Sequence, residues 1–385
     1  MPHFYLGTEI RLLRSSHGAY YSTHTGLSLK MLEPYLALGE VTIVGRVEDT
    51  GTADPSLILE HEKISILALP TYRGLRGLVS VMPTVIRTVA KIKPGDSVIV
   101  ARLPEPISIL LAVRARVAHI HLLSLVVANC YDLIKPETLA KHLVRSLWGA
   151  TVKGLVQRST AVVYVTRCWL QERFPPAEGV PTLNRSSVLI DEVTPARTSK
   201  ASSNDVLKVI SMGQLTTMIK GIDVVIEAVA LANTEGHKMT LELLGDGALR
   251  SDLEQKAREL GIAERVIFHG NVSDREELFG HLDAADVFVS ASRAEGLPRA
   301  VIEAMTRGLP VISTDAGGSA ELVNPAMVIP VDDVSGMVER LQKLATTPEL
   351  YTQLSRESVD MATSIKDSVS PQRYRQFLAK VFTAS

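Results

Sequence analysis

The chain has 385 residues, of which 46% are hydrophobic and 22% are charged. This length exceeds that of one ordinary domain and predicts two domains of similar size, while the composition excludes an intrinsically disordered chain. The formal net charge is −1, but residues 1–195 are net basic and the remainder is net acidic. We therefore expect an anionic acceptor or surface near the first half, with a chance distribution of charge as the alternative.

Cysteine content and hydropathy favour a cytoplasmic protein. The two cysteines, Cys130 and Cys168, do not form a metal-ligand pair, and such sparse thiols are typical of a reducing compartment. The N-terminal residues lack the apolar core of a signal peptide, and the longest apolar tracts are interrupted by charged residues, proline or histidine. These tracts predict buried strands and helices, not membrane spans.

In the first half, short apolar runs alternate with segments of helical period. This pattern is typical of a parallel sheet with helices on both faces. Strands are predicted at 10–13, 41–47, 64–70, 97–101, 119–127, 162–166 and 188–190, and helices at 78–90 and 139–156.

The loop after the first predicted strand contains His17 and Gly18, where a glycine would let a ligand approach the backbone. Asn129 and Asp132 close the apolar run that ends at residue 127. Asp132 either orients an acceptor hydroxyl or caps a helix that starts near residue 136. All four residues are candidates for the acceptor side, with solvent exposure and no role as the alternative for His17.

Residues 72–93 combine five basic side chains with apolar residues at helical spacing. They predict either peripheral contact with an anionic membrane, at its inner face, or an ordinary surface helix with a solvated basic face. Pro83 is expected to weaken a long helix here. Neither aromatic–basic interleaving nor zinc-ligand spacing indicates nucleic acid.

The second half repeats the alternation, with strands predicted at 206–212, 240–244, 266–269, 287–290 and 311–314. Residues 191–205 before it contain Pro, Ser, Thr and charged residues with almost no large apolar side chain, which is the composition of a linker. The predicted domains are residues 1–192 and 193–369, followed by a terminal helix at 370–385.

Four glycines and a lysine lie at the ends of the first two strands of this second domain. Lys220 precedes Gly221 at an expected helix start, where a cation would face a bound diphosphate. The alternative is that Lys220 is an ordinary solvated residue of the helix. Glycine at 213, 245 and 247 would allow close approach to a nucleotide, although no dinucleotide-binding fingerprint is present.

The segment 294–323 carries two glutamates and two expected helix starts. Glu295 precedes a helix predicted to begin at Pro298, and Glu303 lies inside that helix. Residues Gly317, Gly318 and Ser319 are expected to open a second helix, and with the Gly296 and Leu297 amides they would hold a diphosphate. Carboxylates suit hydroxyl groups, so we expect the hexose of a nucleotide-sugar beside Glu295 and its ribose beside Glu303. The alternative is a pair of surface glutamates.

The order and spacing of EGLPRAVIEA and GLPVISTDAGGSAELV resemble the paired-glutamate signature of glycosyltransferase family 4, the glycosyl transferases group 1. VISMGQLTTMIKGIDVVIEAVA and the segment from Leu241 extend this resemblance over most of the C-terminal half. Similarity in the N-terminal half is weaker, around ARLPEP and YVTRCWLQERFPP, and is closest to bacterial polysaccharide and secondary-metabolite members.

The resemblance implies an α/β GT-B fold, with two doubly wound Rossmann-like domains facing across a cleft. The first would supply the acceptor surface and the second the donor site, and the terminal helix would cross back to the first. It places Gly270 and Asn271 against the nucleotide base. It also expects an arginine where this chain has Gln214, and a Gly-Asp pair where it has Ala128 and Asn129. His269 is expected to be a packed or half-exposed strand residue, not a catalytic one.

These features predict a hexosyltransferase or N-acetylhexosaminyltransferase acting on a lipid-linked glycan, a natural product or another small molecule, and the resemblance implies retention of anomeric configuration. The donor is a nucleoside-diphosphate sugar, with a UDP-sugar favoured although the residues do not reveal the base. Glu295 and Lys220 are the expected catalytic residues, and no cofactor or metal ligand is assigned. The alternatives are a nucleotide-sugar epimerase, a phosphorylase, or a non-catalytic nucleotide-sugar-binding protein, the last suggested by Gln214.

Overall fold

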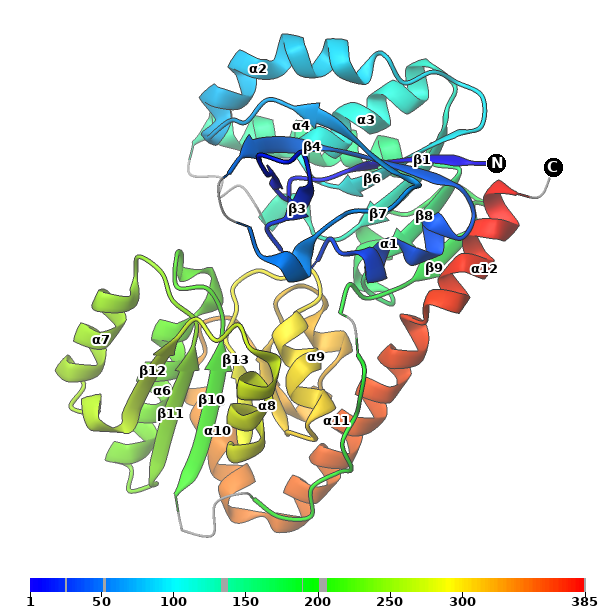
Figure 1. The fold of residues 1–385 in the computed structure, drawn as a ribbon. Helices are drawn as coiled ribbons and strands as arrows, with labels where there is room; N and C mark the ends of the chain where they lie inside the picture. The colour runs from blue at the N-terminus through cyan, green and yellow to red at the C-terminus, as the bar shows by residue number, and fades with distance from the viewer. Residues whose placement is uncertain (25, 51–52, 133–137, 189, 201–205, 384–385) are drawn as a thin grey trace. The chain divides into compact units, whose positions relative to one another are not determined.

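The computed structural model describes residues 1–24, 26–50, 53–132, 138–188, 190–200 and 206–383. The chain forms two compact units, drawn in Figure 1, and each is described here by itself. Unit 1 contains Met1–Ser187 and Ser368–Ser385, and unit 2 contains Val188–Asp367. The division at 187/188 lies just before the linker-like segment.

Unit 1 is built on a nine-stranded sheet in which β5-β4-β1-β6-β7-β8-β9 run parallel. The long strand β4 pairs with β1 along its first half and with β2 at its end, and β2 turns back antiparallel into β3. The strands are β1 His3–Gly7, β2 Leu12–Arg14, β3 Tyr20–Ser22, β4 Glu40–Asp49, β5 Ile64–Leu69, β6 Ser97–Leu103, β7 His121–Val126, β8 Ala161–Tyr164 and β9 Thr182–Asn184.

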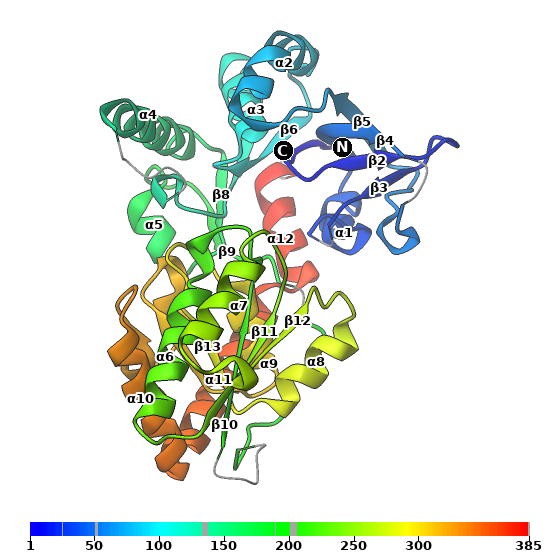
Figure 2. The same ribbon diagram turned by 90° about the vertical axis from the view of Figure 1, so that its left-hand side faces the viewer.

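Helices cover both faces of this sheet, which is why its strands read as unbroken apolar runs. In β6, Val98 and Val100 belong to one buried cluster while Ile99 and Leu103 belong to the other. Figure 2 gives a second view of the helices, which are α1 Leu29–Leu36, α2 Gly74–Val89, α3 Pro106–Val117, α4 Leu139–Val156, α5 Trp169–Arg173 and α12 Pro371–Phe382, with 3-10 turns η1 Pro55–Leu57 and η2 Cys130–Asp132.

The C-terminal helix α12 completes the face of the sheet that α1 also covers. Tyr374 is fully buried there, and its hydroxyl lies 2.5 Å from that of Tyr35. The Arg185 guanidinium stacks 4.4 Å from the centroid of the Tyr374 ring. Unit 1 is therefore assembled from two separate parts of the chain.

Unit 2 has a six-stranded parallel sheet in the order β12-β11-β10-β13-β14-β15. This is the doubly wound order, in which the strand sequence reverses direction between the first and fourth strands, here β10 and β13. The strands are β10 Leu207–Met212, β11 Met239–Leu244, β12 Val266–Gly270, β13 Val287–Ser290, β14 Val311–Thr314 and β15 Val328–Ile329.

The helices of unit 2 connect these strands. Helix α6 packs against β11, α7 and α10, and α9 packs against β13 and β14. Their bounds are α6 Ile222–Thr234, α7 Arg250–Glu259, α8 Arg275–Ala284, α9 Arg299–Thr306, α10 Val334–Thr346 and α11 Pro348–Ser368, with 3-10 turns η3 Met218–Lys220, η4 Ala263–Arg265, η5 Gly317–Glu321 and η6 Pro325–Met327.

The predicted α/β fold class is confirmed, and the second-half strands lie within a residue of their predicted bounds. Three local predictions are wrong. The first strand is β1 and not 10–13, since polar His3 and Tyr5 obscure its apolar pattern. Val188 and Ile190 lie outside strands, and residue 189 lies outside the described residues. Helix α2 continues through Pro83. Within the described residues, no helix is both long and apolar enough to cross a bilayer.

Candidate functional site

The clearest polar pair of unit 2 joins Lys220 and Glu295. Lys220 follows β10 and Glu295 follows β13, the two strands between which the order of the sheet reverses. Lys220 Nζ lies 2.6 Å from Glu295 Oε1, which also accepts a hydrogen bond from the Ser292 hydroxyl at 2.7 Å. Ligands of doubly wound folds bind at this switch point, outside the carboxyl ends of the strands. The structure thus brings the two predicted catalytic residues together at the expected edge.

Glycines hold Lys220 in this position. Gly221 caps α6 with φ +63°, and a Cβ there would lie 2.0 Å from the carbonyl oxygen of Ala291. A Cβ at Gly213 would lie 2.8 Å from Lys220 Cγ. Larger residues would therefore displace the lysine stem or separate the two loops.

Arg293 is a site residue that the sequence analysis missed. Its guanidinium binds both carboxylate oxygens of Asp223, at 2.9 and 2.8 Å, and also Asp332 at 2.7 Å. The same side chain donates to the carbonyl of Met218, and its backbone N–H donates to that of Ile219. Arg293 thereby holds the short turn that carries Lys220. Only the contact with Asp223, 70 residues away, reveals this role.

Glu303 lies in α9, one turn beyond the helix start. Burial raises the pKa of its carboxyl group, and the positive charges of Arg299 and Arg275 partly offset this shift. Pro298 is the N-cap of α9 and not its first helical residue, as its ψ of 111° requires. The amides of Gly296 and Leu297 lie in the half-buried loop before it.

The expected second helix start is a five-residue 3-10 turn, Gly317–Glu321, so the prediction of a helix opening at Gly317–Ser319 is wrong. The N–H of Gly318 donates to the carbonyl of Gly296 at 2.8 Å, and that of Ser319 to Ala316 at 3.2 Å. These two amides are therefore occupied within the protein. Through the hydrogen bond from Gly318 to Gly296, the turn holds the loop that carries Glu295.

Three further predicted donor residues form a ladder of backbone contacts across the strand ends. The N–H of Gly213 donates to Leu244, and that of Gly245 donates to Gly270 at 2.7 Å. A Cβ at Gly245 would lie 1.9 Å from the carbonyl oxygen of Gly213. Glycine is thus needed for packing between loops, whatever binds above them. Gln214 and Asn271, next to this ladder, are exposed.

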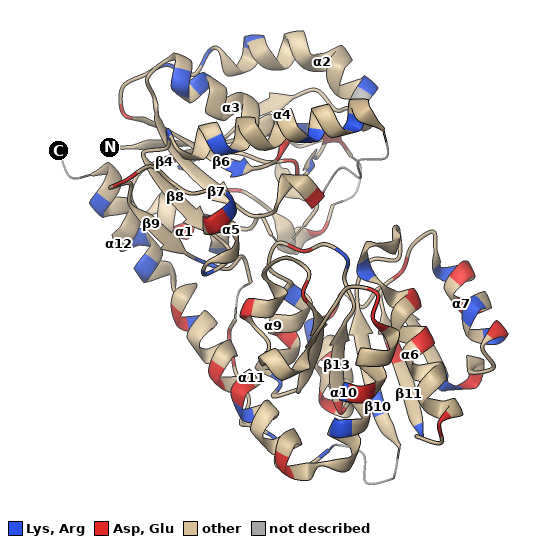
Figure 3. Cartoon of the chain, turned by 180° about the vertical axis from the view of Figure 1, so that it is seen from behind, with Lys and Arg blue, Asp and Glu red and all other residues tan. Residues whose placement is uncertain are grey.

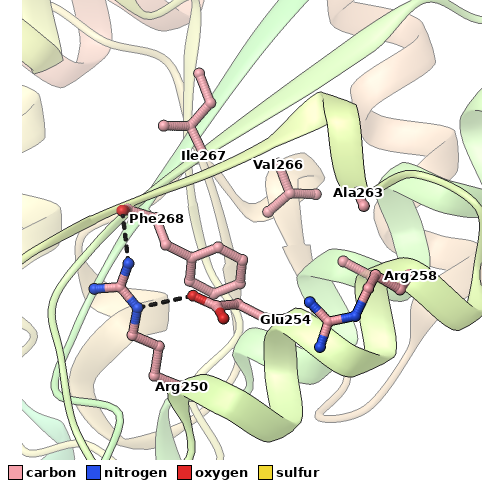
Figure 4. Close-up of a pocket in the computed structure, with 8 residues that line it drawn as sticks. Arg250, Glu254, Arg258, Ala263, Val266, Ile267 and Phe268 are labelled. Carbon is pink, nitrogen blue, oxygen red and sulfur yellow. Dashed lines mark hydrogen bonds and ion pairs between the residues drawn. The ribbon is translucent and has the colours of Figure 1, made fainter.

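A pocket of about 320 Å³ lies between α7 and β12, and Figure 4 draws its lining. Arg250 donates there to Glu254 and to the carbonyl of Phe268. None of the predicted donor residues lines this pocket. Arg250 and Glu254 are already paired with each other, so this pocket is not the site that the sequence predicts.

In unit 1, His17 and Gly18 do not follow the first strand. They form the exposed turn of the β2–β3 hairpin, in which Gly18 has φ +84°. The strand before this loop is β2, so the expectation that the loop follows the first strand is wrong. The error follows from the missed strand β1.

Asn129 and Asp132 lie together beyond the end of β7. The Asn129 side chain accepts a hydrogen bond from the N–H of Tyr131, and its carbonyl accepts one from the N–H of Asp132. Burial raises the pKa of Asp132, and a hydrogen bond from Asn129 partly offsets this shift. Asp132 does not cap the next helix, because α4 begins at Leu139 with Thr138 as its cap. The expected start near residue 136 lies outside the described residues.

Two carboxylates that the sequence did not single out, Glu9 and Glu105, lie together beyond the ends of β1 and β6. Glu9 accepts hydrogen bonds from the Tyr72 hydroxyl at 2.7 Å and from the N–H of Ile107, and lies 3.3 Å from Arg46. The N–H of Glu9 donates to Glu105, whose pKa burial raises to about 7. These residues are adjacent because β1, β4 and β6 are neighbours, so the cluster follows from topology alone.

Comparison with known proteins agrees with this geometry. Residues 193–360 match the family model described as glycosyl transferases group 1. This match covers most of unit 2. The chain is 24% identical over 350 residues to Protein CapJ of Staphylococcus aureus, covering 88% of this chain and 85% of that protein.

Solved structures place the chain in the GT-B fold. Sucrose-phosphate synthase from Thermosynechococcus elongatus is similar with a TM-score of 0.72 and 18% identity, over 100% of both chains. Anabaena Alr3699/HepE in complex with UDP is similar with a TM-score of 0.66 and 18% identity, again over 100% of both chains. The chain therefore has the GT-B fold.

Proposed function

We propose that this protein moves a hexose or N-acetylhexosamine from a nucleoside-diphosphate sugar to an acceptor hydroxyl, with retention of anomeric configuration. The observation that carries the proposal is the Lys220–Glu295 pair at the switch point of unit 2. The UDP in the Anabaena HepE structure favours a UDP-sugar as the donor. Similarity to the Vi polysaccharide biosynthesis protein VipC/TviE of Salmonella typhi, 40% identical over 112 residues, favours a polysaccharide or lipid-linked glycan as the acceptor.

Donor binding would use both members of the pair. The lysine ammonium would turn from Glu295 toward the diphosphate, where positive charge is most effective in a partly buried site. Both hydrogen bonds to Glu295 are at Oε1, so Oε2 would accept from a hydroxyl of the sugar. Glu303, half-buried in α9, would accept from the ribose, and the backbone at Gly270 and Asn271 would face the base.

The reaction would break the bond between the anomeric carbon and the donor phosphate oxygen. The electron pair passes to the diphosphate, whose charge Lys220 and the loop amides stabilise. The acceptor oxygen forms the new bond on the same face, and its proton passes to an oxygen of the departing diphosphate. This route needs no protein nucleophile and no bound metal.

In unit 1, Asn129 and Asp132 would orient the acceptor. Asp132 is half-buried and remains close to the cations Arg173 and Arg145, so it can accept from a hydroxyl without a large cost in desolvation. His17 and Gly18, in the hairpin turn, are weaker candidates. The Glu9–Tyr72 cluster is a further polar surface at the ends of β1 and β6.

The proposal is tested by measuring UDP release and product formation with purified protein, UDP-sugars and lipid-linked or soluble acceptors. Glu295→Gln should abolish transfer while retaining the fold, and NMR should show the donor's anomer in the product. Epimerised donor or free sugar phosphate without acceptor would indicate an epimerase or a phosphorylase. Nucleotide binding without turnover on any acceptor would indicate a non-catalytic binding protein. Gln214 is the reason to test this alternative, because it stands where the resemblance expects an arginine.

A lipid-linked acceptor would lie in a membrane, and unit 1 has a basic surface that could contact one. Helices α2, α3 and α4 contain no Asp or Glu and carry Arg76, Arg87, Arg114, Arg116, Lys141, Arg145 and Lys153. Figure 3 shows Lys and Arg along α2 and α4. The exposed apolar side chains of this α2–α4 surface are Val79, Ile86, Val113, Val117, Leu139, Leu143, Val144 and Leu147.

We infer that the α2–α4 surface contacts an anionic bilayer. Basic side chains beside exposed apolar ones are typical of interfacial helices, and the lack of acidic residues removes repulsion from anionic lipid. Residues 72–93 contribute through α2, but the four exposed apolar residues of α4 make it the larger part. Such contact would bring the enzyme to a lipid-linked acceptor.

A further inference from the structure

Three side chains with metal-ligating atoms meet in unit 2, and none of them is assigned to the donor, although His269 directly precedes Gly270. Glu242 lies in β11, His269 in β12 and His281 in the last turn of α8. Glu242 Oε2 lies 2.9 Å from His269 Nε2 and 3.2 Å from His281 Nδ1. The two imidazole rings are 4.1 Å apart between centroids. One ligand atom from each residue lies within 4.8 Å of the others.

The fold brings these residues together through strand pairing. In β11 the residues beside Glu242 are buried and Glu242 itself is half-exposed, because alternate residues point to opposite faces. Glu242 pairs with Ile267, and His269 is two residues further along β12 on the same face. Since β12 is the edge strand, α8 covers this face only in part. No spacing in the sequence indicates the cluster, because its members are 27 and 12 residues apart.

We propose that Glu242, His269 and His281 bind a divalent transition-metal ion, with Zn²⁺ as the preferred occupant. Two imidazole nitrogens and one carboxylate oxygen are a recurrent zinc ligand set, with bonds of about 2.0–2.2 Å. Ligand atoms around a tetrahedral ion are then about 3.3 Å apart, close to the two distances to Glu242 Oε2. The three side chains are 21–24% exposed, which leaves a fourth position for water.

The ion would join two elements that the backbone connects only through a loop. His269 precedes Gly270 and Asn271, and α8 starts after Asp274, whose side chain caps the helix by accepting from the N–H of Glu277. Ligation by both histidines would fix the end of β12 to the end of α8. The role is structural, since Lys220 and Glu295 belong to other strand ends, and it does not depend on the proposed function.

The test uses the full chain, stripped of metal with a chelator and then titrated with Zn²⁺ in a calorimeter. We expect one equivalent to bind, to raise the melting temperature, and to be displaced by chelator. Co²⁺ in place of Zn²⁺ should give the visible absorption bands of a tetrahedral site. His269→Ala and His281→Ala should each weaken Zn²⁺ binding by about tenfold or more.

His237→Ala is the matched control, because His237 is a half-exposed histidine of the same unit outside the cluster. Glu242→Gln preserves side-chain shape while removing the anionic ligand, and circular dichroism checks that each variant is folded. Absence of Zn²⁺ binding to the unaltered chain would overturn the proposal. Undiminished binding in the variant that lacks both His269 and His281 would also overturn it, because the ion would then lie elsewhere.

Discussion

Gly317 lies so close to Glu295 that a Cβ at position 317 would be 1.9 Å from the Glu295 carbonyl oxygen. Gly317 also has φ +62°, which disfavours any side chain. The close packing of the turn after β14 therefore determines the position of the loop that carries Glu295, the candidate catalytic glutamate.

Gly317→Ala should displace this loop and weaken both the fold and the donor site. We expect a loss of about 1–3 kcal/mol in the free energy of unfolding, measured with urea, and a smaller thermal shift with UDP. Gly280→Ala is the control, because a Cβ there meets no atom within 4 Å. Equal effects of the two substitutions would refute the packing argument.

Lys220→Met and Glu295→Gln should each reduce sugar transfer by about 100-fold or more, because each removes charge or an acceptor that the transition state needs. The double variant should be little worse than either single one, since the two side chains act as a pair. Lys256→Met is the control, as it breaks the ion pair of Lys256 with Glu227 between α7 and α6. Retained activity in both single variants would remove the donor-site assignment.

Arg293→Lys should keep a positive charge but lose the two-pronged contact with Asp223. The turn at residues 218–220 would then loosen, and we expect KM for the donor to rise more than kcat falls. Arg340→Lys, on α10, is the control because Arg340 pairs only with its exposed neighbour Glu339 among the carboxylates of the described residues. A change confined to kcat would argue against a positioning role for Arg293.

Glu105 predicts a pH dependence of stability. Burial raises its pKa from 4.5 to about 7, so the folded state holds a proton that the unfolded chain has already lost between these values. The free energy of unfolding should therefore fall as pH rises through this window and then level off. Urea titrations at pH 5 and pH 8 should differ less for Glu105→Gln than for the unaltered chain. Glu178→Gln, at an exposed loop position, should leave the difference unchanged.

The α2–α4 surface predicts binding to vesicles with anionic lipid and not to purely zwitterionic vesicles, with binding weakened by salt. Replacement of Leu143 and Leu147 by Asp should abolish sedimentation with anionic vesicles. Leu260→Asp is the control, because Leu260 is an exposed leucine of unit 2. If the double variant instead changes only the oligomeric state in solution, the surface is an interface between copies of the chain.

The sequence predicts much of unit 2 because its strands are buried on both faces and bounded by glycine. The helix 139–156 was also predicted to the residue, since its apolar residues keep a helical period. Strand β1 escaped detection because His3 and Tyr5 alternate with apolar residues. The linker prediction captured composition but not packing, since Arg197 donates to three backbone carbonyls of unit 2.

In the candidate site too, some residues could be predicted from local sequence and others could not. The Glu295 and Lys220 positions follow from motif order, because each motif lies directly after a strand. Arg293, the Glu9–Glu105 contact and the Glu242 cluster depend on which strands are neighbours, and a single sequence does not contain that information. Likewise, no local pattern distinguishes a five-residue 3-10 turn at Gly317 from the first turn of an α-helix.

The burial of Tyr374 against Tyr35 has a consequence for synthesis of the chain. One face of the first sheet is covered only in part, by α1, until residues 371–382 have left the ribosome, whereas the second unit has its whole sequence before then. The unit that is translated first is therefore the last to be completed, and its nascent form must wait with a partly exposed apolar face while its successor folds.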